Sequence, residues 1–279
     1  MQIRLLPFLL LLCLVVLASC GDASDKDASE ETTDMADFAD EKDFKDAHDT
    51  PKDIAFTPKG EMVTFDTPDG KTATAYALMP EEKPDKFILV FQEWWGLNDH
   101  IKQEAERLFE ALDVVGVIAP DMYDGKVADN QEDAGKYMQA FNADRGNAII
   151  DGMMAYAGEE AKFATIGWCF GGGLSLKASI MAADKGLGCV MYYGMPVQSA
   201  EEIAPLEVDV LGIFAEKDGW ITPAVATKFE NLAKATGKNV TINQFDAEHA
   251  FANPSNPKFD EKAAAEANAM ALAFLKEKL

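Results

Sequence analysis

The sequence of 279 residues predicts an α/β fold, a mostly parallel sheet that opens with an antiparallel hairpin and carries helices on both faces. Short apolar runs alternate with stretches of helical periodicity along most of the chain, as in strands joined by crossover helices. Pro68-Asp69-Gly70 separates two alternating segments near the start of this pattern, which indicates a hairpin. The run KFILVFQ at 86–92 has an unbroken apolar centre, which is typical of a strand buried on both faces of a parallel sheet.

The remaining elements follow in a regular order. Unbroken apolar runs predict the inner strands, and apolar residues three or four positions apart, such as Ile101, Ala105 and Leu108, predict helices. Asp99 is the expected N-cap of the first helix. Gly146 and Gly152 weaken the continuity of the long helical stretch. In chain order the predicted strands are 61–66, 72–79, 86–92, 114–119, 163–166, 188–193, 208–214 and 239–245, and the predicted helices are 99–112, 129–158, 174–184, 223–235 and 257–278.

Residues 1–19 have the character of a bacterial lipoprotein signal peptide. Arg4 supplies a positive charge, and the apolar run from Leu5 to Leu17 is too short to span a bilayer comfortably. Leu17-Ala18-Ser19-Cys20-Gly21 resembles the lipobox, which implies cleavage before Cys20 and a lipid on that cysteine. The alternative is an ordinary secretory signal with a chance cysteine. The lipobox implies a protein anchored by lipid in the bacterial cell envelope, on the periplasmic side of a membrane or at the cell surface.

Residues 20–53 are predicted to be a disordered acidic tether ahead of a folded domain at 54–279. From residue 21 to residue 53 the chain carries thirteen Asp and Glu against four Lys, so this stretch contributes −9 to the net charge of −23. Such a segment cannot bury enough apolar surface to become ordered, and its self-repulsion extends it. His48 lies in this stretch and is expected to be solvated. The acidic balance of the chain argues against nucleic acid as a partner.

Cys169 lies at the centre of Gly167-Trp168-Cys169-Phe170-Gly171, between the apolar run at 163–166 and a helical stretch. The pattern G-x-C-x-G between a strand and a helix is the thiol form of the nucleophile elbow. Its glycines let the strand and the helix pack closely, and the turn holds the sulfur beside the positive end of the helix. The alternative is a glycine-rich turn that contains a buried cysteine.

Asp218 and His249 follow the predicted strands at 208–214 and 239–245. Together with Cys169 they give the chain order nucleophile, acid, histidine, which is that of the α/β-hydrolase triad. We expect Cys169 to attack an acyl carbon, His249 to transfer the protons, and Asp218 to orient the imidazole and stabilise its charged form.

The groups that complete this site can also be placed from the sequence. The backbone N–H groups of Phe170, just after the nucleophile, and of Trp94, in the loop after an early strand, are expected to bind the oxyanion. The chain has three histidines. His48 falls in the predicted tether and His100 near the start of a surface helix, so His249 is the expected base.

The chain resembles the dienelactone hydrolase family from about residue 55 to its C-terminus. The matching stretches are QEWWGLNDHI at 92–101, APDMY at 119–123, GWCFGG at 167–172, and Asp218 with His249. The resemblance implies a single α/β-hydrolase domain without a large cap and a Cys-Asp-His triad at the three residues named above. It also implies that Glu93 hydrogen-bonds the resting thiol and takes its proton when substrate displaces the carboxylate.

The chain departs from the archetypal members in its arginines, which there bind a substrate carboxylate. The residues after His249 are Ala-Phe-Ala-Asn, and the predicted domain contains only Arg107, expected to face solvent, and Arg145. An acidic protein without those arginines should attract an anionic lactone poorly. We expect instead an aromatic, largely uncharged pocket lined by Trp95, Tyr123, Trp220 and Phe251.

The predicted function is that of a membrane-tethered, cysteine-dependent hydrolase that cleaves a carboxylic ester or lactone through an acyl-enzyme on Cys169. The alternative is a binding lipoprotein that retains the fold with little or no turnover. A thiol redox protein is disfavoured because there is no C-x-x-C motif, and Cys189 is expected to be a buried strand residue. No metal site and no cofactor are expected, since P-loop, dinucleotide and Cys/His-cluster patterns are missing from the sequence.

Overall fold

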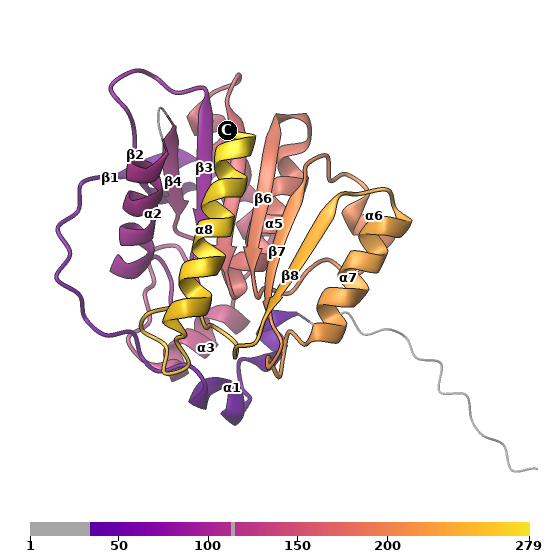
Figure 1. Cartoon of the computed structure of the whole chain (residues 1–279). Helices are drawn as coiled ribbons and strands as arrows, with labels where there is room; N and C mark the ends of the chain where they lie inside the picture. Colours follow the sequence, from indigo (N-terminus) through magenta and orange to yellow (C-terminus); the bar gives the residue numbers. More distant parts are fainter. Residues whose placement is uncertain (1–33, 113–114) are drawn as a thin grey trace, which may run out of the picture. The chain divides into compact units, whose positions relative to one another are not determined.

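The computed structural model describes residues 34–112 and 115–279, which form one sheet with helices on both sides (Figure 1). The predicted signal peptide at 1–19, the lipidation site at Cys20 and the first part of the tether lie outside the described residues. In the part of the chain that is described, none of the helices has the length and apolar character needed to cross a membrane.

The sheet confirms the predicted fold class. Its strand order is β1-β2-β4-β3-β5-β6-β7-β8. β1 pairs with β2 and β2 pairs with β4 in antiparallel fashion, and the pairs that follow are parallel. The bounds are β1 Glu61–Asp66, β2 Thr72–Leu78, β3 Lys86–Phe91, β4 Gly116–Pro120, β5 Lys162–Trp168, β6 Gly186–Tyr192, β7 Val210–Ala215 and β8 Val240–Phe245.

Helices cover both faces of the sheet, with α2 and α8 on one face and α5 on the other (Figure 1). The N-cap of α2 is Asn98, whose side chain accepts a hydrogen bond from the Ile101 N–H at 3.1 Å, so the predicted cap at Asp99 was wrong by one residue. The bounds are η1 Met35–Phe38, α1 Lys42–Asp46, α2 Asp99–Ala111, α3 Gln131–Gln139, α4 Ala143–Ala157, α5 Phe170–Ala182, η2 Ala183–Lys185, α6 Ala200–Ile203, α7 Pro223–Ala235 and α8 Glu261–Lys278.

The long helix predicted at 129–158 is two helices, α3 and α4. The break falls just before Asn142, whose side chain caps α4 by accepting a hydrogen bond from the Arg145 N–H at 2.9 Å. Gly146 and Gly152 lie inside α4 and do not interrupt it. A Cβ on Gly152 would lie 2.5 Å from the Asp66 carbonyl oxygen, so this glycine serves close packing against the first strand.

The carboxyl ends of the parallel strands meet at one edge of the sheet. Phe91 is paired with Gly167 and Trp168 with Tyr192, while the last residues of β7 and β8, Ala215 and Phe245, face each other. The loops after β3, β5, β7 and β8 therefore start side by side. This register brings together residues that are up to 160 positions apart in the chain, such as Glu93 and Asn253.

Residues 34–48, called here the N-terminal segment, correct the predicted tether. They contain η1 and α1, and the side chains of Met35, Phe44 and His48 are only 2%, 0% and 3% exposed. The Gln131 side-chain amide, at the start of α3, donates hydrogen bonds to the Lys45 and His48 carbonyl oxygens. A few apolar residues at suitable spacing thus bind the segment to the domain despite its acidic composition. The domain accordingly begins earlier than the predicted residue 54.

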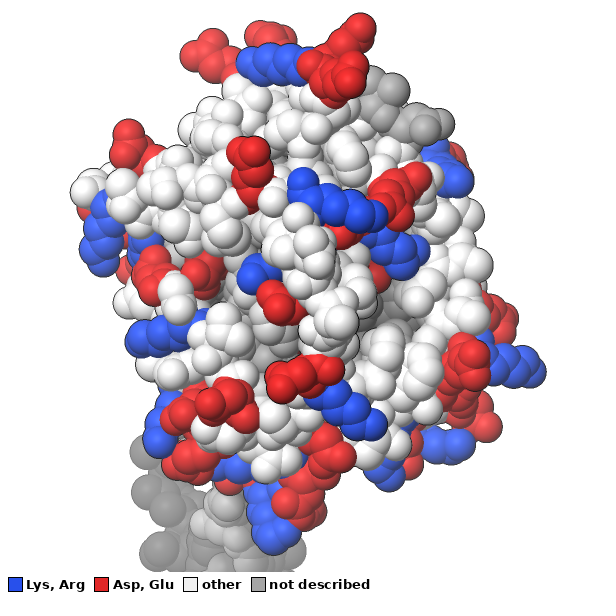
Figure 2. Space-filling view, turned by 90° about the vertical axis from the view of Figure 1, so that its left-hand side faces the viewer, with Lys and Arg blue, Asp and Glu red and all other residues white. Residues whose placement is uncertain are grey.

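Charged side chains of both signs are mixed over the face shown in Figure 2, with uncharged surface between them. Neither the positive nor the negative side chains form a continuous patch on that face. It therefore offers no basic surface of the kind that binds a polyanion.

Candidate active site

Cys169 occupies the sharp turn between β5 and α5, in the strained backbone conformation φ 54°, ψ −121°. The flanking glycines are required by close contacts. A Cβ on Gly167 would lie 2.0 Å from the Gly171 carbonyl oxygen, and one on Gly171 would lie 2.4 Å from the Gln92 carbonyl oxygen. α5 starts at Phe170, four residues earlier than predicted, so the sulfur lies at the first turn of the helix. The strand, turn and helix of a nucleophile elbow are all present.

His249 lies between Cys169 and Asp218. Its Nδ1 donates a hydrogen bond to Asp218 Oδ2 at 2.6 Å, and its Nε2 lies 3.4 Å from Cys169 Sγ. Asp218 is itself held by the backbone, because its Oδ1 accepts hydrogen bonds from the N–H groups of Trp220 and Ile221, both at 2.9 Å. Three residues predicted from separate strand ends therefore form one continuous chain of contacts.

The charges around these three residues favour a charged His249–Asp218 pair beside a neutral Cys169 thiol. Burial opposes the charged imidazole, but the charge and hydrogen bond of Asp218 outweigh it and raise the pKa of His249 to about 10. Burial also opposes the Asp218 carboxylate, yet the His249 charge and the backbone N–H groups lower its pKa. Burial is the largest influence on Cys169 and raises the pKa of its thiol.

Glu93 lies on the loop after β3 and is 8% exposed. Burial raises its pKa to about 7, although the His249 charge and a hydrogen bond from Asn253 act in the opposite direction. Asn253 Nδ2 donates that bond to Glu93 Oε2 at 2.6 Å. The expected hydrogen bond between Glu93 and the resting thiol is thus not the one formed here. The carboxylate is directed to Asn253, while the thiol lies against His249.

The four aromatic residues predicted to line a pocket have different surroundings. Two pack on other aromatic rings, one lies near His249, and one belongs to the core. Trp95 packs against Trp94 with ring centroids 4.9 Å apart, and Tyr123 stacks on Phe170 at 5.7 Å. Trp220 is half-buried, with its ring 5.8 Å from His249. The side chain of Phe251 is fully buried against Tyr193 and Phe245, so this residue belongs to the core.

The two predicted oxyanion donors come from the elbow and from the loop after β3. Phe170 directly follows Cys169, and its N–H interacts with the sulfur and favours the thiolate. Trp94 follows Glu93 on the loop after β3, which runs beside the elbow because β3 and β5 are paired. Its indole is fully buried, and Nε1 has no hydrogen-bond partner in the described structure.

The N-terminal segment covers this site, which the sequence analysis did not foresee. The His48 ring centroid is 5.2 Å from that of His249 and 5.0 Å from that of Trp94. Phe44 packs edge-on against Trp94 at 5.1 Å and Trp220 at 5.2 Å. Burial, reinforced by the His249 charge, lowers the pKa of His48 to about 3, so its imidazole is neutral. The expectation of a solvated His48 was therefore wrong.

A pocket of about 430 Å³ includes Glu93 in its lining. It is lined by the side chains of α2 together with Trp168, Asn253 and Pro254. Arg107 was expected to face solvent but lines this pocket, with its guanidinium bound to Glu104. Arg145 lies elsewhere, in ion pairs with Asp69 and Asp124. The guanidinium groups of both arginines are therefore already paired with carboxylates.

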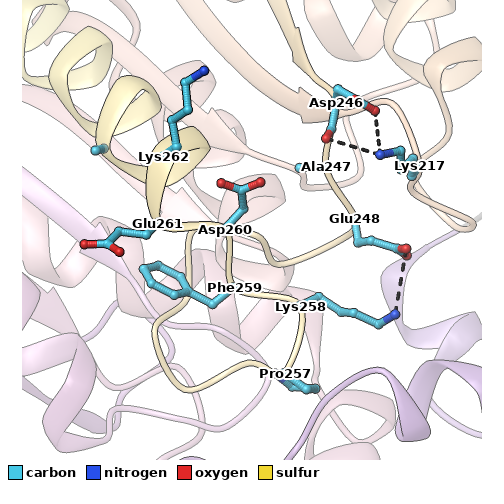
Figure 3. Close-up of a pocket in the computed structure, with 11 residues that line it drawn as sticks. Lys217, Asp246, Ala247, Glu248, Pro257, Lys258, Phe259, Asp260, Glu261 and Lys262 are labelled. Atoms are coloured by element: carbon cyan, nitrogen blue, oxygen red, sulfur yellow. Dashed lines mark hydrogen bonds and ion pairs between the residues drawn. The ribbon is translucent and has the colours of Figure 1, made fainter.

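A larger hollow of about 680 Å³ lies beside the loop that carries His249 (Figure 3). Its lining is charged, and ion pairs join Lys217 to Asp246 and Lys258 to Glu248. It contains no thiol, hydroxyl or histidine, so it lacks the paired nucleophile and histidine found at Cys169.

The sequence pattern did not identify three residues of the site, namely His48, Tyr193 and Asn253. Tyr193 directly follows β6 with a positive φ of 34°, and its ring lies 5.1 Å from that of His249. Its position at a strand end was the available signal, the same one that identified Asp218. Both cysteines in the described residues, Cys169 and Cys189, are free, and Cys189 is buried in β6 as expected.

Comparisons with known proteins agree with this geometry. Residues 73–279 match the dienelactone hydrolase family. The chain is 29% identical over 233 residues to protein usf of Aquifex pyrophilus, which covers 79% of this chain and 99% of that protein. It is 27% identical over 234 residues to a carboxymethylenebutenolidase of Pseudomonas putida, with coverages of 77% and 95%. A dienelactone hydrolase-like promiscuous phosphotriesterase from metagenomic libraries has a similar fold, with a TM-score of 0.68, 21% identity and coverages of 78% and 98%.

Proposed function

Because this chain belongs to the dienelactone hydrolase family and is thus a hydrolase of esters or lactones, we propose that it acts through a thioester on Cys169. The observation that carries the proposal is the chain of contacts from Asp218 through His249 to Cys169, at 2.6 and 3.4 Å. Nucleophilic catalysis requires a nucleophile within reach of a base that is itself oriented by a third group.

Glu93 is the group best suited to receive the thiol proton. A pKa of about 10 means that His249 already carries its proton at neutral pH, so it cannot accept another. Glu93 has a pKa of about 7 and lies close enough for its charge to influence Cys169. In the proposed first step the carboxylate leaves Asn253, the S–H bond breaks, the proton moves to Glu93, and the thiolate attacks the substrate carbonyl carbon.

The remaining steps follow from the same groups. The N–H groups of Phe170 and Trp94 would stabilise the oxyanion, and His249 would give its proton to the departing alkoxide. The neutral imidazole would then take a proton from water, and the resulting hydroxide would attack the thioester. Release of the acid returns the sulfur as a thiolate, which recovers its proton from Glu93. The net reaction consumes one ester and one water.

We propose an uncharged ester or lactone as the substrate. Arg107 is paired with Glu104, Arg145 is paired with Asp69 and Asp124, and the chain has a net charge of −23. An anionic substrate would meet repulsion without a compensating guanidinium. Aromatic rings around the thiol suit an apolar acyl group better.

One observation favours the alternative of a binding protein with little turnover. Cys169 is only 1% exposed, and Phe44 and His48 lie over the site. An N-terminal segment that stayed closed would exclude substrate. The trapping experiment below also decides between these two functions.

We further propose that the chain is a lipoprotein anchored through Cys20 in the bacterial cell envelope. The support is the sequence Leu17-Ala18-Ser19-Cys20-Gly21. The acidic stretch that follows would then connect the anchor to the hydrolase.

The catalytic proposal is tested by trapping the acyl-enzyme on the full chain. A neutral activated ester should add its acyl mass to the peptide that contains Cys169, and Cys169→Ala should abolish both the adduct and turnover. Cys189→Ala is the matched control and should retain both. Turnover in the Cys169→Ala variant would overturn the thioester mechanism, and the absence of turnover and adduct in wild type would favour the binding function.

A further inference from the structure

His48 is a buried histidine with one nitrogen that the described structure leaves without a hydrogen-bond partner. Its Nδ1 donates a hydrogen bond to the Phe44 carbonyl oxygen at 2.7 Å, whereas its Nε2 has none. The side chain is 3% exposed, so water does not readily compensate for the missing partner. A buried lone pair without a donor is costly, which suggests that a further group belongs there.

The surroundings of His48 indicate what that group is. One ligand atom each from His48, Cys169 and His249 lies within 4.8 Å of the other two. His249 is fixed in the same way as His48, because its Nδ1 donates to Asp218 while its Nε2 lies 3.4 Å from the sulfur. In both histidines Nδ1 is engaged, so Nε2 is the nitrogen that can coordinate a metal, in His249 once that nitrogen has lost its proton.

We propose that His48, Cys169 and His249 form a binding site for a zinc ion. Zinc accepts imidazole nitrogen at roughly 2.0–2.1 Å and thiolate sulfur at roughly 2.3 Å, and sites with three protein ligands leave a fourth position open. Tetrahedral ligands at these lengths are about 3.5 Å apart, a separation that His249 and Cys169 already have at 3.4 Å. The ligand atom of His48 lies within 4.8 Å of the other two, so it must approach by about 1 Å to complete the set.

The outer contacts match those of known metal-binding histidines. Such histidines usually donate their second N–H to a carboxylate or a backbone carbonyl, which fixes the ring and strengthens the ligand. Asp218 does this for His249, and the Phe44 carbonyl oxygen does it for His48. One thiolate and two imidazoles suit zinc and exclude magnesium and calcium, which prefer oxygen ligands.

Binding of the zinc ion would displace protons and inactivate the Cys169 thiol. The S–H bond of Cys169 breaks, a sulfur–zinc bond forms, and the proton leaves to solvent, as does any proton on His249 Nε2. The sulfur and the imidazole are then unavailable for acyl transfer. Because His48 belongs to the N-terminal segment, the same ion would hold that segment closed over the site.

The first test measures zinc affinity on the full, metal-free chain by calorimetry or by competition with a chromogenic chelator. Wild type should bind one zinc ion per chain. His48→Gln should bind it more weakly by over about 100-fold, since removal of an outer contact alone costs roughly 10–100-fold. His100→Gln is the matched control, because His100 is bound to the Lys52 carbonyl oxygen away from the sulfur, and should bind like wild type.

A second measurement covers the case in which a variant folds poorly. Cobalt(II) added to wild type should give the spectrum of a tetrahedral site with a thiolate-to-metal charge-transfer band, and Cys169→Ser should lack that band. Binding through the acidic residues alone would give an oxygen-ligated spectrum without the band and would overturn the site. Unchanged zinc affinity in His48→Gln or in Cys169→Ser would overturn it as well. These readouts do not depend on turnover, so they remain decisive if the hydrolase mechanism fails.

Discussion

Glu93 is the residue at which catalysis and stability are most directly opposed. Its carboxyl group is buried, and that burial raises its pKa to about 7. The raised pKa suits a group that accepts and returns a proton near neutral pH. The same burial makes the charged carboxylate unfavourable in the folded chain. The effect of Glu93 on turnover and its effect on stability can therefore each be tested.

Glu93→Gln should lower kcat by about 10²–10⁴-fold with a much smaller effect on KM, because the amide keeps the shape but cannot accept the thiol proton. In wild type, kcat/KM should fall below about pH 7 as Glu93 becomes protonated, and again above about pH 10 as His249 loses its proton. The acidic limb should vanish in the variant. A wild-type level of kcat in Glu93→Gln would exclude the carboxylate as the proton acceptor.

Glu93→Gln should also change how stability depends on pH. The folded pKa of about 7 lies above the ordinary value of 4.5, so the stability that Glu93 contributes is fully present below about pH 4.5 and is lost as the pH rises through 7. The loss in wild type between pH 4 and pH 8 has an upper limit of about 3 kcal/mol, and the variant should lack it. Chemical denaturation at several pH values measures this, with the exposed Glu248→Gln as the control that should behave like wild type.

At the level of elements, the N-terminal segment is held mainly by Phe44. The ring is fully buried between Trp94 and Trp220, and hydrogen bonds from Gln131 hold the end of α1. The exposed residues of the segment are mostly acidic. Local opening should therefore cost far less than global unfolding.

Phe44→Ala should release the segment and expose the thiol. Alkylation of Cys169 by iodoacetamide should accelerate at least tenfold, while that of Cys189 in β6 should not change and the melting temperature should fall only slightly. Peptide mass spectrometry over a time course gives both rates. Phe38→Ala is the control, since Phe38 is only partly buried and should give a smaller acceleration. Equal rates in wild type and Phe44→Ala would mean that the segment does not shield the sulfur.

At the scale of the whole molecule, the proposed lipid anchor at Cys20 can be tested by substitution. If Cys20 carries lipid, Cys20→Ser should move the protein from the membrane to the soluble fraction or leave its signal peptide uncleaved. Fractionation and intact-mass measurement read out the two results. A soluble wild-type protein without added lipid mass would contradict the lipoprotein proposal.

The parts of the molecule that could be predicted are those that depend on the regular alternation of strands and helices along the sequence. Cys169, Asp218 and His249 each lie in the turn or loop that follows a predicted strand, and parallel strands must end at one edge, so their meeting could be foreseen. The helix break before Asn142 was missed because glycines draw attention as helix breakers, whereas here they serve packing.

The N-terminal segment shows why the rest could not be predicted. Its average composition is that of a disordered chain, but order depends on where a few side chains fit. Phe44 finds a site between two tryptophans that come from different loops, and the Trp220 indole N–H donates a hydrogen bond to Glu41 at 3.1 Å. Neither contact leaves a local pattern in the sequence.

The order of the strands also determines when the enzyme can become active during synthesis. His249 follows β8, which lies at the edge of the sheet and pairs only with β7. A chain growing from its N-terminus therefore exposes Cys169, the proposed nucleophile, about eighty residues before His249 emerges. These pairings are distant in sequence and slow to form, so the thiol remains without its catalytic partner until the last strand has docked. If the proposed mechanism holds, a nascent chain of this protein can misfold or be oxidised but cannot yet hydrolyse an ester.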